Sequence, residues 1–252
     1  MNKKGYFSGS TLKWIAIITM FMDHSAKLLY LPQSIIEQLP PAMETFYTAL
    51  IKIFDIFLIL GRLSFPLFCF LLVEGFVHTS NVKKYFSRLL IFALISEVPY
   101  DLAFRNSFFT LEKQNVFFTL LIGLVVLMGL EKVKERTPLN IILSLGIVFA
   151  GIFTAEFLQT DYGGWIGVLL ISVLYYLREY PLVKCLAGGL VILQNSISGL
   201  FSFIFIYFYN GQRGRQWKYL FYWFYPAHLL VLIGIQQYIL LPYIRMIFST
   251  IP

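Results

Sequence analysis

Charged side chains are scarce in this sequence. Only 13% of its 252 residues are Asp, Glu, Lys or Arg, whereas a water-soluble domain carries about 25%. Apolar residues make up 58% of the chain, and its mean hydropathy is +0.74. The composition therefore excludes a water-soluble globule and indicates a protein that lies within a membrane.

Cysteine and histidine are also scarce. The two cysteines, Cys69 and Cys185, both lie inside apolar runs, where a disulfide framework is not expected. The three histidines lie far apart and lack the spacing that metal-binding motifs require. We therefore expect no metal in this protein.

Long apolar runs are abundant instead. A helix needs about 20 residues to cross a hydrocarbon core about 30 Å thick. The runs therefore predict an all-α, polytopic transmembrane helical bundle of about eight spans, with seven to ten possible, as a single domain over residues 1–252. The runs cover residues 12–31, 46–78, 84–104, 115–130, 139–158, 162–178, 183–209 and 219–241.

Two of these runs are irregular. The run 46–78 is longer than one perpendicular span needs, and it contains Gly61 and Pro66. Proline lacks a backbone N–H and clashes with the preceding turn, so we expect a kink near Gly61–Pro66. Polar residues at 194–199 interrupt the run 183–209, which predicts a broken or re-entrant element.

The distribution of Lys and Arg favours a cytoplasmic N-terminus in the plasma membrane. With that orientation and eight spans, twelve of these residues, Arg245 among them, fall inside and seven outside. Arg213, Arg215 and Lys218 are the exception, because they form a basic loop that this topology places outside. The alternative is that the interrupted run 183–209 turns back, which returns the loop to the cytoplasmic side.

Ionisable residues inside apolar runs are costly and so mark functional or paired positions. Several of these residues also have a structural interpretation. Asp23 could pair with Lys27, and Arg62 could pair with Asp55 or Glu97. Glu74 could lie at the membrane interface beside His78, and His228 could donate to a backbone carbonyl. His24 is the strongest candidate for chemistry, because an imidazole titrates near neutral pH and lies beside a carboxylate. The candidates are Asp23, His24, Asp55, Arg62, Glu74, Glu97, Asp101 and His228.

Several blocks of residues resemble the TraX family of integral membrane proteins. They are residues 12–16 with 23–24, 61–68 with 73–76, 96–101, 114–119, 209–211 and 224–228. The family takes its name from a protein that acetylates the N-terminus of pilin, so the resemblance implies acyl transfer more firmly than it implies a pilin acceptor. Lys13 and His24 also have a spacing similar to the basic residue and histidine of the acyltransferase-3 family, with Lys in place of the usual Arg.

Together with these residues, the resemblance implies an acyltransferase that moves an acetyl or other acyl group from acyl-CoA to an amine or hydroxyl. His24 is the expected general base or covalent relay, and Asp23 or Glu97 is expected to raise its basicity. Arg62 is expected to stabilise the oxyanion or to hold a carboxylate of the acceptor. Acyl-CoA phosphates are expected on Lys13, Lys83, Lys84 and Arg88, and Glu74, Asp101, Asn115, Tyr225 and His228 are expected to line the pocket or hold the acceptor.

The expected partners are acyl-CoA, membrane lipids and an envelope protein, peptide or glycan that accepts the acyl group; nucleic acid is not expected. Two other classes of function stay open. One is a transporter or flippase, since broken helices and charges within the membrane are common to both classes. The other is a non-catalytic assembly factor for a surface appendage.

Overall fold

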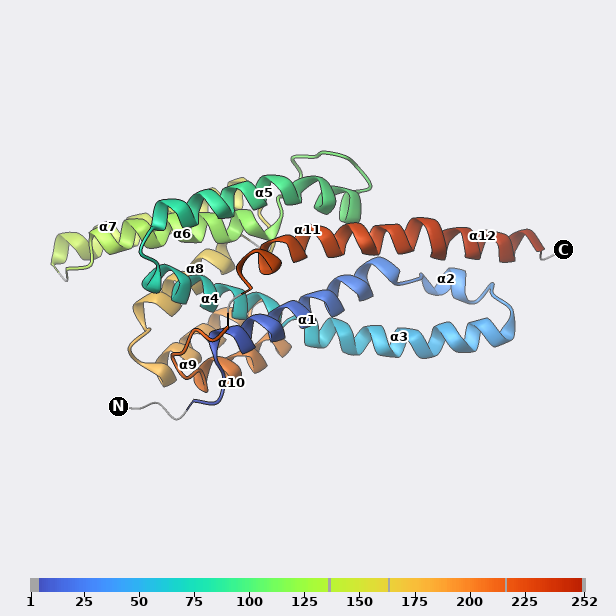
Figure 1. Cartoon of the computed structure of the whole chain (residues 1–252), viewed down its shortest axis with the longest axis horizontal. Helices are drawn as coiled ribbons and strands as arrows, with labels where there is room; N and C mark the ends of the chain where they lie inside the picture. The colour runs from blue at the N-terminus through green and yellow to red at the C-terminus, as the bar shows by residue number, and fades with distance from the viewer. Residues whose placement is uncertain (1–4, 136, 163, 216, 251–252) are drawn as a thin grey trace.

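The protein is a bundle of helices that run mostly along one direction (Figure 1). A computed structural model describes residues 5–135, 137–162, 164–215 and 217–250. No strand is formed in these residues, which confirms the all-α prediction. The helices are α1 Gly9–Leu29, α2 Gln33–Ile36, α3 Pro41–Gly61, α4 Ser64–His78, α5 Val82–Arg105, α6 Val116–Lys132, α7 Pro138–Phe157, α8 Trp165–Tyr176, α9 Pro181–Ile192, η1 Ser198–Phe201, α10 Ser202–Tyr207, α11 Lys218–Ile235, η2 Gln236–Leu240 and α12 Leu241–Thr250.

Short polar side chains begin many of these helices. Ser8 accepts a hydrogen bond from the Thr11 N–H at 3.2 Å, and Asn81 accepts one from the Lys84 N–H at 2.8 Å. Each satisfies one of the four N–H groups that a helix leaves without a partner at its start. The caps on α1 and α5 thus fix where the helices that carry the site begin.

Helix α1 packs against three other helices and exposes one face, which carries Trp14, Ile18 and Phe21. The three helices are α3, α4 and α11, while α5 packs on α11 and α6, and α8 on α4 and α6. The arrangement surrounds the C-terminal half of α1 with side chains from several other helices. Residues far apart in sequence, on α1 and α11, can therefore meet in the interior.

A second, smaller core lies at the end of the bundle opposite the N-terminus. There α2, the first part of α3 and α12 extend beyond the other helices (Figure 1). They contact one another through Leu31, Ile36, Tyr47, Ile244 and Ile247, all of which are buried. Hydrophobic burial holds this extension together separately from the main core.

The surface of the bundle is largely apolar, as a lipid environment requires. Helix α7 buries only Gly151 and Ala155 and exposes Phe149, Phe153 and Phe157. Three helical stretches of the described chain are long and apolar enough to cross a membrane: 41–78, which joins α3 and α4, 138–157 and 219–249. The membrane character is thus confirmed, and the number of spans stays a prediction.

The predicted kink is present as a two-residue turn between α3 and α4. Helix α3 ends at Gly61, a turn follows at Arg62 and Leu63, and α4 begins at Ser64. The Ser64 hydroxyl donates to the Gly61 carbonyl at 2.8 Å and so satisfies a backbone group that the break frees. Pro66 lies in the first turn of α4, where a missing N–H is tolerated.

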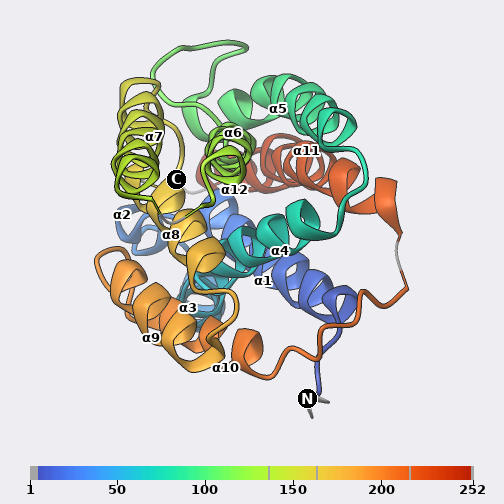
Figure 2. The same ribbon diagram turned by 90° about the vertical axis from the view of Figure 1, so that its left-hand side faces the viewer.

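The interrupted run also breaks as predicted, between α9 and η1, and this changes the topology. The following segment returns to the N-terminus: Gly9 N–H donates to the Gln212 carbonyl at 2.8 Å and Ser10 N–H to the Arg213 carbonyl at 3.0 Å. Figure 2 shows this segment beside the first residues of α1. The described chain thus follows the arrangement in which the interrupted run turns back, and Arg213 and Arg215 lie at the same end of the bundle as the N-terminus rather than opposite it.

The position of Arg245 changes for the same reason. Because α9 and α10 turn back, α11 starts at the N-terminal end and the chain finishes at the other end (Figure 1). Arg245 therefore lies at the end opposite the N-terminus, not on the N-terminal side. The first change adds Arg213 and Arg215 to the N-terminal end and the second removes Arg245 from it, so together they still increase the excess of positive charge there.

Candidate active site

His24 and His228 form a buried pair in the interior of the bundle. His24 comes from α1 and His228 from α11, and each is 5% exposed. The Nδ1 of His24 lies 2.7 Å from the Nε2 of His228, and the two ring planes are within 7° of parallel. The structure thus brings together two of the residues predicted from the sequence, which are 204 positions apart.

The contacts of His228 determine which nitrogen of His24 carries a proton. The Nδ1 of His228 lies 2.7 Å from the Phe224 carbonyl, which can only accept, so this nitrogen donates. A neutral imidazole has one N–H, so the Nε2 of His228 accepts from the Nδ1–H of His24. The Nε2 of His24 is then left with a free lone pair, as a general base requires.

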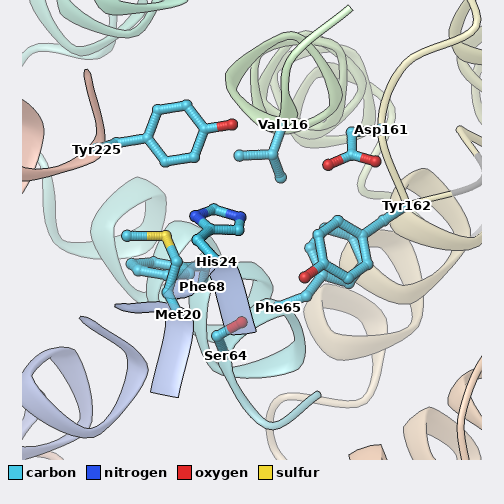
Figure 3. Close-up of a pocket in the computed structure, with 9 residues that line it drawn as sticks. All are labelled: Met20, His24, Ser64, Phe65, Phe68, Val116, Asp161, Tyr162 and Tyr225. Carbon is cyan, nitrogen blue, oxygen red and sulfur yellow. The ribbon is translucent and has the colours of Figure 1, made fainter. Parts of the chain in front are cut away.

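This side of His24 faces a small cavity. The cavity measures about 10 Å³, enough for a single water-sized group. Figure 3 shows one ring nitrogen of His24 directed toward the side where Asp161 and Tyr162 lie. The lining residues are Met20, His24, Ser64, Phe65, Phe68, Val116, Asp161, Tyr162 and Tyr225.

Hydroxyl groups lie around the cavity. The ring of Tyr162 stacks on Phe65 with centroids 4.2 Å apart, and its hydroxyl hydrogen-bonds to Ser64. Burial raises the pKa of the Tyr162 hydroxyl, which therefore stays protonated and can donate. The hydroxyl of Tyr225 is buried without a hydrogen-bond partner among the described residues, so it is available to a bound molecule.

Asp161 and Tyr162 were not predicted as site residues. They lie in the turn between α7 and α8, which is held against the start of α6: Asp161 N–H donates to the Gln114 carbonyl at 2.9 Å, and Thr119 donates to the Asp161 carbonyl at 2.8 Å. The φ of Tyr162 is 60°, a left-handed conformation that is costly for a bulky side chain. In the sequence, only their position near the junction of two apolar runs could have pointed to them as site residues.

Asp23 lies next to His24 but is paired elsewhere. It is fully buried, forms an ion pair with Lys27 one turn along α1, and packs directly against Gly61. Its Oδ2 is 3.9 Å from the Nε2 of His24, too far for a hydrogen bond but close enough to stabilise a positive charge on the ring. Both the predicted pairing with Lys27 and the proximity to His24 are present.

Glu97, Asn115 and Asp101 hold the α5–α6 connection rather than His24. The Asn115 side chain donates to Glu97 and, at 2.8 Å, to the Ala93 carbonyl, while its oxygen accepts from the Phe117 N–H at 3.0 Å. Asp101 accepts from the N–H of Thr110 at 2.7 Å. The contact expected between Glu97 and His24 is not formed in the described part of the chain.

Arg62 and Glu74 lie on different sides of the site. Arg62 is half-buried at the α3–α4 turn, and its charge acts on the hydroxyl of Tyr162. Within the described residues it makes no ion pair with Asp55 or Glu97, so that structural interpretation is wrong. Glu74 hydrogen-bonds to Tyr209, away from the cavity, as its expected interfacial position implies.

The basic residues predicted to hold phosphates lie at the N-terminal ends of α1 and α5. The ammonium of Lys13 is 5.3 Å from the centre of the Phe221 ring, and the charge of Arg213 acts on it. Arg88 is half-buried and hydrogen-bonds to Tyr222. Lys83 and Lys84 are exposed in the first turn of α5. Lys13 lies eleven residues before His24, about 16 Å along the helix.

The side chains that bind metals are dispersed. Among the residues that the structure describes, no three His, Cys, Asp or Glu side chains lie together as a metal would need. The arrangement is instead that of a membrane protein with a buried imidazole pair and a ring of hydroxyls, which suits acid–base chemistry.

Comparisons with known proteins identify the family. The model of the family described as "TraX protein" matches residues 8–236, so the chain belongs to the TraX family. The chain is also 30% identical over 267 residues to the "Probable fimbrial assembly protein FimC, serogroup H1" of Dichelobacter nodosus, covering 95% of this chain and 100% of that protein. No solved structure matches.

Proposed function

We propose that this protein is a multi-pass acyltransferase of the plasma membrane with its N-terminus in the cytoplasm. It takes an acyl group, most simply acetyl, from acyl-CoA and transfers it to an amine or hydroxyl of an envelope molecule. The observation that carries the proposal is the hydrogen-bond relay from the Phe224 carbonyl through His228 to His24, which leaves the Nε2 of His24 free beside the cavity.

In the proposed reaction, His24 acts as a general base. Its Nε2 accepts the proton of the acceptor's amine or hydroxyl as that group attacks the thioester carbonyl, and the new C–N or C–O bond forms. The C–S bond then breaks, and the leaving thiolate takes the proton from His24, which restores the neutral ring. Attack by His24 itself, with an acyl-imidazole as intermediate, is the alternative course of the same reaction.

Other residues support this step. The hydroxyls of Tyr162 and Tyr225 are the proposed donors to the oxyanion, which Arg62 assists through its charge. Asp23, 3.9 Å away, stabilises the imidazolium that forms on His24. The cavity is too small for both substrates, so binding must displace side chains such as the stacked Phe65 and Tyr162 rings.

The donor is proposed to bind at the cytoplasmic, N-terminal end. Lys13, Lys83, Lys84 and Arg88 lie there, and Arg213 joins them from the returning segment 210–215. Such a cluster suits the phosphates of CoA, which exists only in the cytoplasm. An extended pantetheine arm can span the roughly 16 Å between Lys13 and His24.

The test uses the purified chain with acetyl-CoA labelled in the acetyl group and an envelope extract as the acceptor source. We expect transfer or slow hydrolysis by the unchanged protein and a loss of about 10²–10⁴-fold in His24→Ala. His78→Ala is the matched control, since the third histidine lies exposed at the end of α4. Full activity in His24→Ala would overturn the assignment.

A non-catalytic role in fimbrial assembly is the second candidate. It is favoured by the name of the similar protein from Dichelobacter nodosus, a probable fimbrial assembly protein. Under this proposal the protein supports appendage assembly equally well with His24→Ala, and it neither hydrolyses nor transfers the label. The same pair of variants therefore separates the two functions.

A further inference from the structure

The cavity beside His24 has the size and the lining of a site for one water molecule. Its volume of about 10 Å³ admits a single water, and a buried water makes about three hydrogen bonds to polar groups. The polar groups that line it are the ring of His24, the carboxylate of Asp161 and the hydroxyls of Tyr162 and Tyr225 (Figure 3). One water can therefore bridge the Nε2 of His24 to the Asp161 carboxylate.

Asp161 connects this cavity to the medium outside the bundle. It is the one carboxylate among the described residues that line the cavity, and its side chain is 20% exposed. Its Oδ1 forms an ion pair at 2.8 Å with Lys113, whose side chain is 36% exposed. Lys113 lies in the loop between α5 and α6, at the end of α5 that points away from the N-terminus (Figure 1). The carboxylate can therefore exchange protons with water at that end.

The turn that carries Asp161 is held in a costly conformation. Gln159 and Tyr162 both have a positive φ, 49° and 60°, which is uncommon for residues other than glycine. Hydrogen bonds fix the turn to the start of α6: the Gln114 N–H donates to the Gln159 carbonyl at 3.2 Å, and its carbonyl accepts from the Asp161 N–H at 2.9 Å. Strain of this kind persists where the surrounding structure imposes it, and it clusters at functional sites. The backbone thus holds Asp161 at the cavity independently of its ion pair.

The ionisable groups around Asp161 come from several elements. Its charge acts on the hydroxyls of Tyr100 and Tyr225, and the carboxylate of Glu97 acts on both as well. Glu97 is bonded to Asn115 and does not line the cavity, so it does not compete for a proton of His24. The groups that share the cavity with Asp161 or interact with its charge are His24 in α1, Glu97 and Tyr100 in α5, Lys113 before α6, Tyr162 in the same turn and Tyr225 in α11.

Asp23 also lies near the Nε2 of His24, but it cannot pass a proton on. Its side chain is 1% exposed, and it is paired with Lys27, an ammonium that already holds its protons. Asp23 therefore stabilises a positive charge on His24 without removing it. Asp161 is free of this restriction, because its own carboxylate reaches the medium.

An amine acceptor brings one proton more than the leaving group can take. At neutral pH an amine is mostly an ammonium ion, and its acetylation takes two protons from the nitrogen. The leaving thiolate receives one of them from His24. The other has to leave the site first, because a protonated His24 cannot act as a base.

We infer that Asp161 is the proton outlet of the site, the group that takes this first proton from His24 and releases it to the medium. The N–H bond of the ammonium breaks, its electron pair stays on the nitrogen, and the proton binds the Nε2 of His24. His24 gives the proton to the cavity water, that water gives another of its protons to Asp161, and Asp161 releases it at the end of the bundle opposite the N-terminus. His24 is then neutral and ready for the proton that the attacking amine loses. The inference rests on the proposed acyl transfer for the source of the proton and not for its path.

The first test follows the proton without catalysis. The chain has three histidines, so nitrogen NMR of the full chain with labelled histidine, in lipid nanodiscs, gives three sets of ring signals. His24→Ala assigns the signals of His24, and the exposed His78 is the internal reference. The measurement is the rate at which the Nε2 proton of His24 exchanges with water, at a pH at which the ring is partly protonated.

Asp161→Asn should slow this exchange about tenfold or more, because an amide cannot take up a proton and pass it on. Asp161→Glu keeps a carboxylate at the cavity and should retain most of the rate. Glu112→Gln is the matched control, because it removes a carboxylate that pairs with Arg105 at the same end of the bundle but does not line the cavity. The rate in this control should not change.

Two results would overturn the outlet: unchanged exchange in Asp161→Asn, or slower exchange in Asp23→Asn alone. Slower exchange in the Asp161→Asn variant of a protein that transfers no acetyl group would leave the outlet standing and refute the proposed function. The two proposals can therefore fail separately.

The second test compares two acceptors of labelled acetyl groups. Ethylamine is almost wholly protonated at neutral pH, whereas trifluoroethylamine, of similar size, is mostly unprotonated and brings no extra proton. Asp161→Asn should lower the ratio of transfer to ethylamine over transfer to trifluoroethylamine about tenfold or more at neutral pH, and the ratio should recover as the pH rises. An unchanged ratio with a general loss of transfer would show that Asp161 only supports the turn, which would overturn the outlet and leave the acyltransferase proposal intact.

Discussion

Removing the acceptor nitrogen of His228 tests the relay directly. In His228→Phe, the Nδ1–H of His24 loses its partner at 2.7 Å, and nothing then holds the proton on Nδ1. The proton can move to Nε2, which turns the base nitrogen beside the cavity into a donor. The tautomer needed for catalysis becomes the minor one.

The size of the effect follows from the hydrogen bond. Leaving a buried donor without a partner costs about 1–3 kcal/mol. If that amount sets the preference between the two tautomers of His24, losing it lowers kcat about 5- to 150-fold. His228→Gln should retain most of the activity, since its amide oxygen can accept in place of Nε2.

The assay is acetyl transfer at saturating acetyl-CoA by the single and double variants, with detergent melting temperatures measured in parallel. If His228 acts only through His24, then His24→Ala combined with His228→Phe is no slower than His24→Ala alone. Multiplicative losses in the double variant, or equal losses in His228→Gln and His228→Phe, would refute the tautomer argument.

Two further predictions concern packing and donor binding. Gly61→Ala should lower the free energy of unfolding by about 1–3 kcal/mol, because the added carbon meets Asp23. Gly146→Ala in α7 is the control: a carbon added there has no neighbour within 4 Å, so the variant should be neutral or stabilising. Melting in detergent measures both variants. Lys83→Ala with Lys84→Ala should raise the KM for acetyl-CoA about 2- to 30-fold at low salt with kcat unchanged, and the difference should shrink as salt is added. Lys132→Ala with Lys134→Ala, which removes two positive charges at and just after the end of α6, is the control, and an equal rise in its KM would contradict a specific phosphate site.

The sequence allowed the interruptions in the fold to be predicted because they depend on local chemistry. The sequence marks two places where a helix is interrupted, near Gly61 and Pro66 and at the polar residues 194–199. A helix ends at or just before each of them. The sequence left open the end of the bundle at which residues 210–215 lie, because that depends on whether the interrupted run crosses the bundle or turns back. A run that crosses the bundle and a run that turns back have the same hydropathy, so hydropathy does not distinguish them.

Several residues of the site could be predicted from the sequence, but the contacts between them could not. His24 and His228 stood out because ionisable residues are rare in apolar runs, yet no local pattern reports that α1 and α11 pack together. Glu97 stood out for the same reason and proved to hold Asn115. Tyr162 was missed because it lies in a turn, where a tyrosine is unremarkable without its tertiary neighbours.

The partner of His24 is another neutral imidazole rather than a carboxylate, and this choice suits a site inside a membrane. A carboxylate hydrogen-bonded to His24 would add an uncompensated charge to an apolar interior, at a cost of about 2.5–3.5 kcal/mol on insertion scales. Asp23 avoids that cost by pairing with Lys27, yet its Oδ2 stays 3.9 Å from the Nε2 of His24. The resting pair is therefore neutral, and a counter-charge is already in place for the moment at which His24 takes a proton. In this relay, His228 fixes which ring nitrogen of His24 carries the proton, and Asp23 stabilises the charged form of His24. One aspartate performs both tasks in a serine protease triad, and here they are divided between two residues.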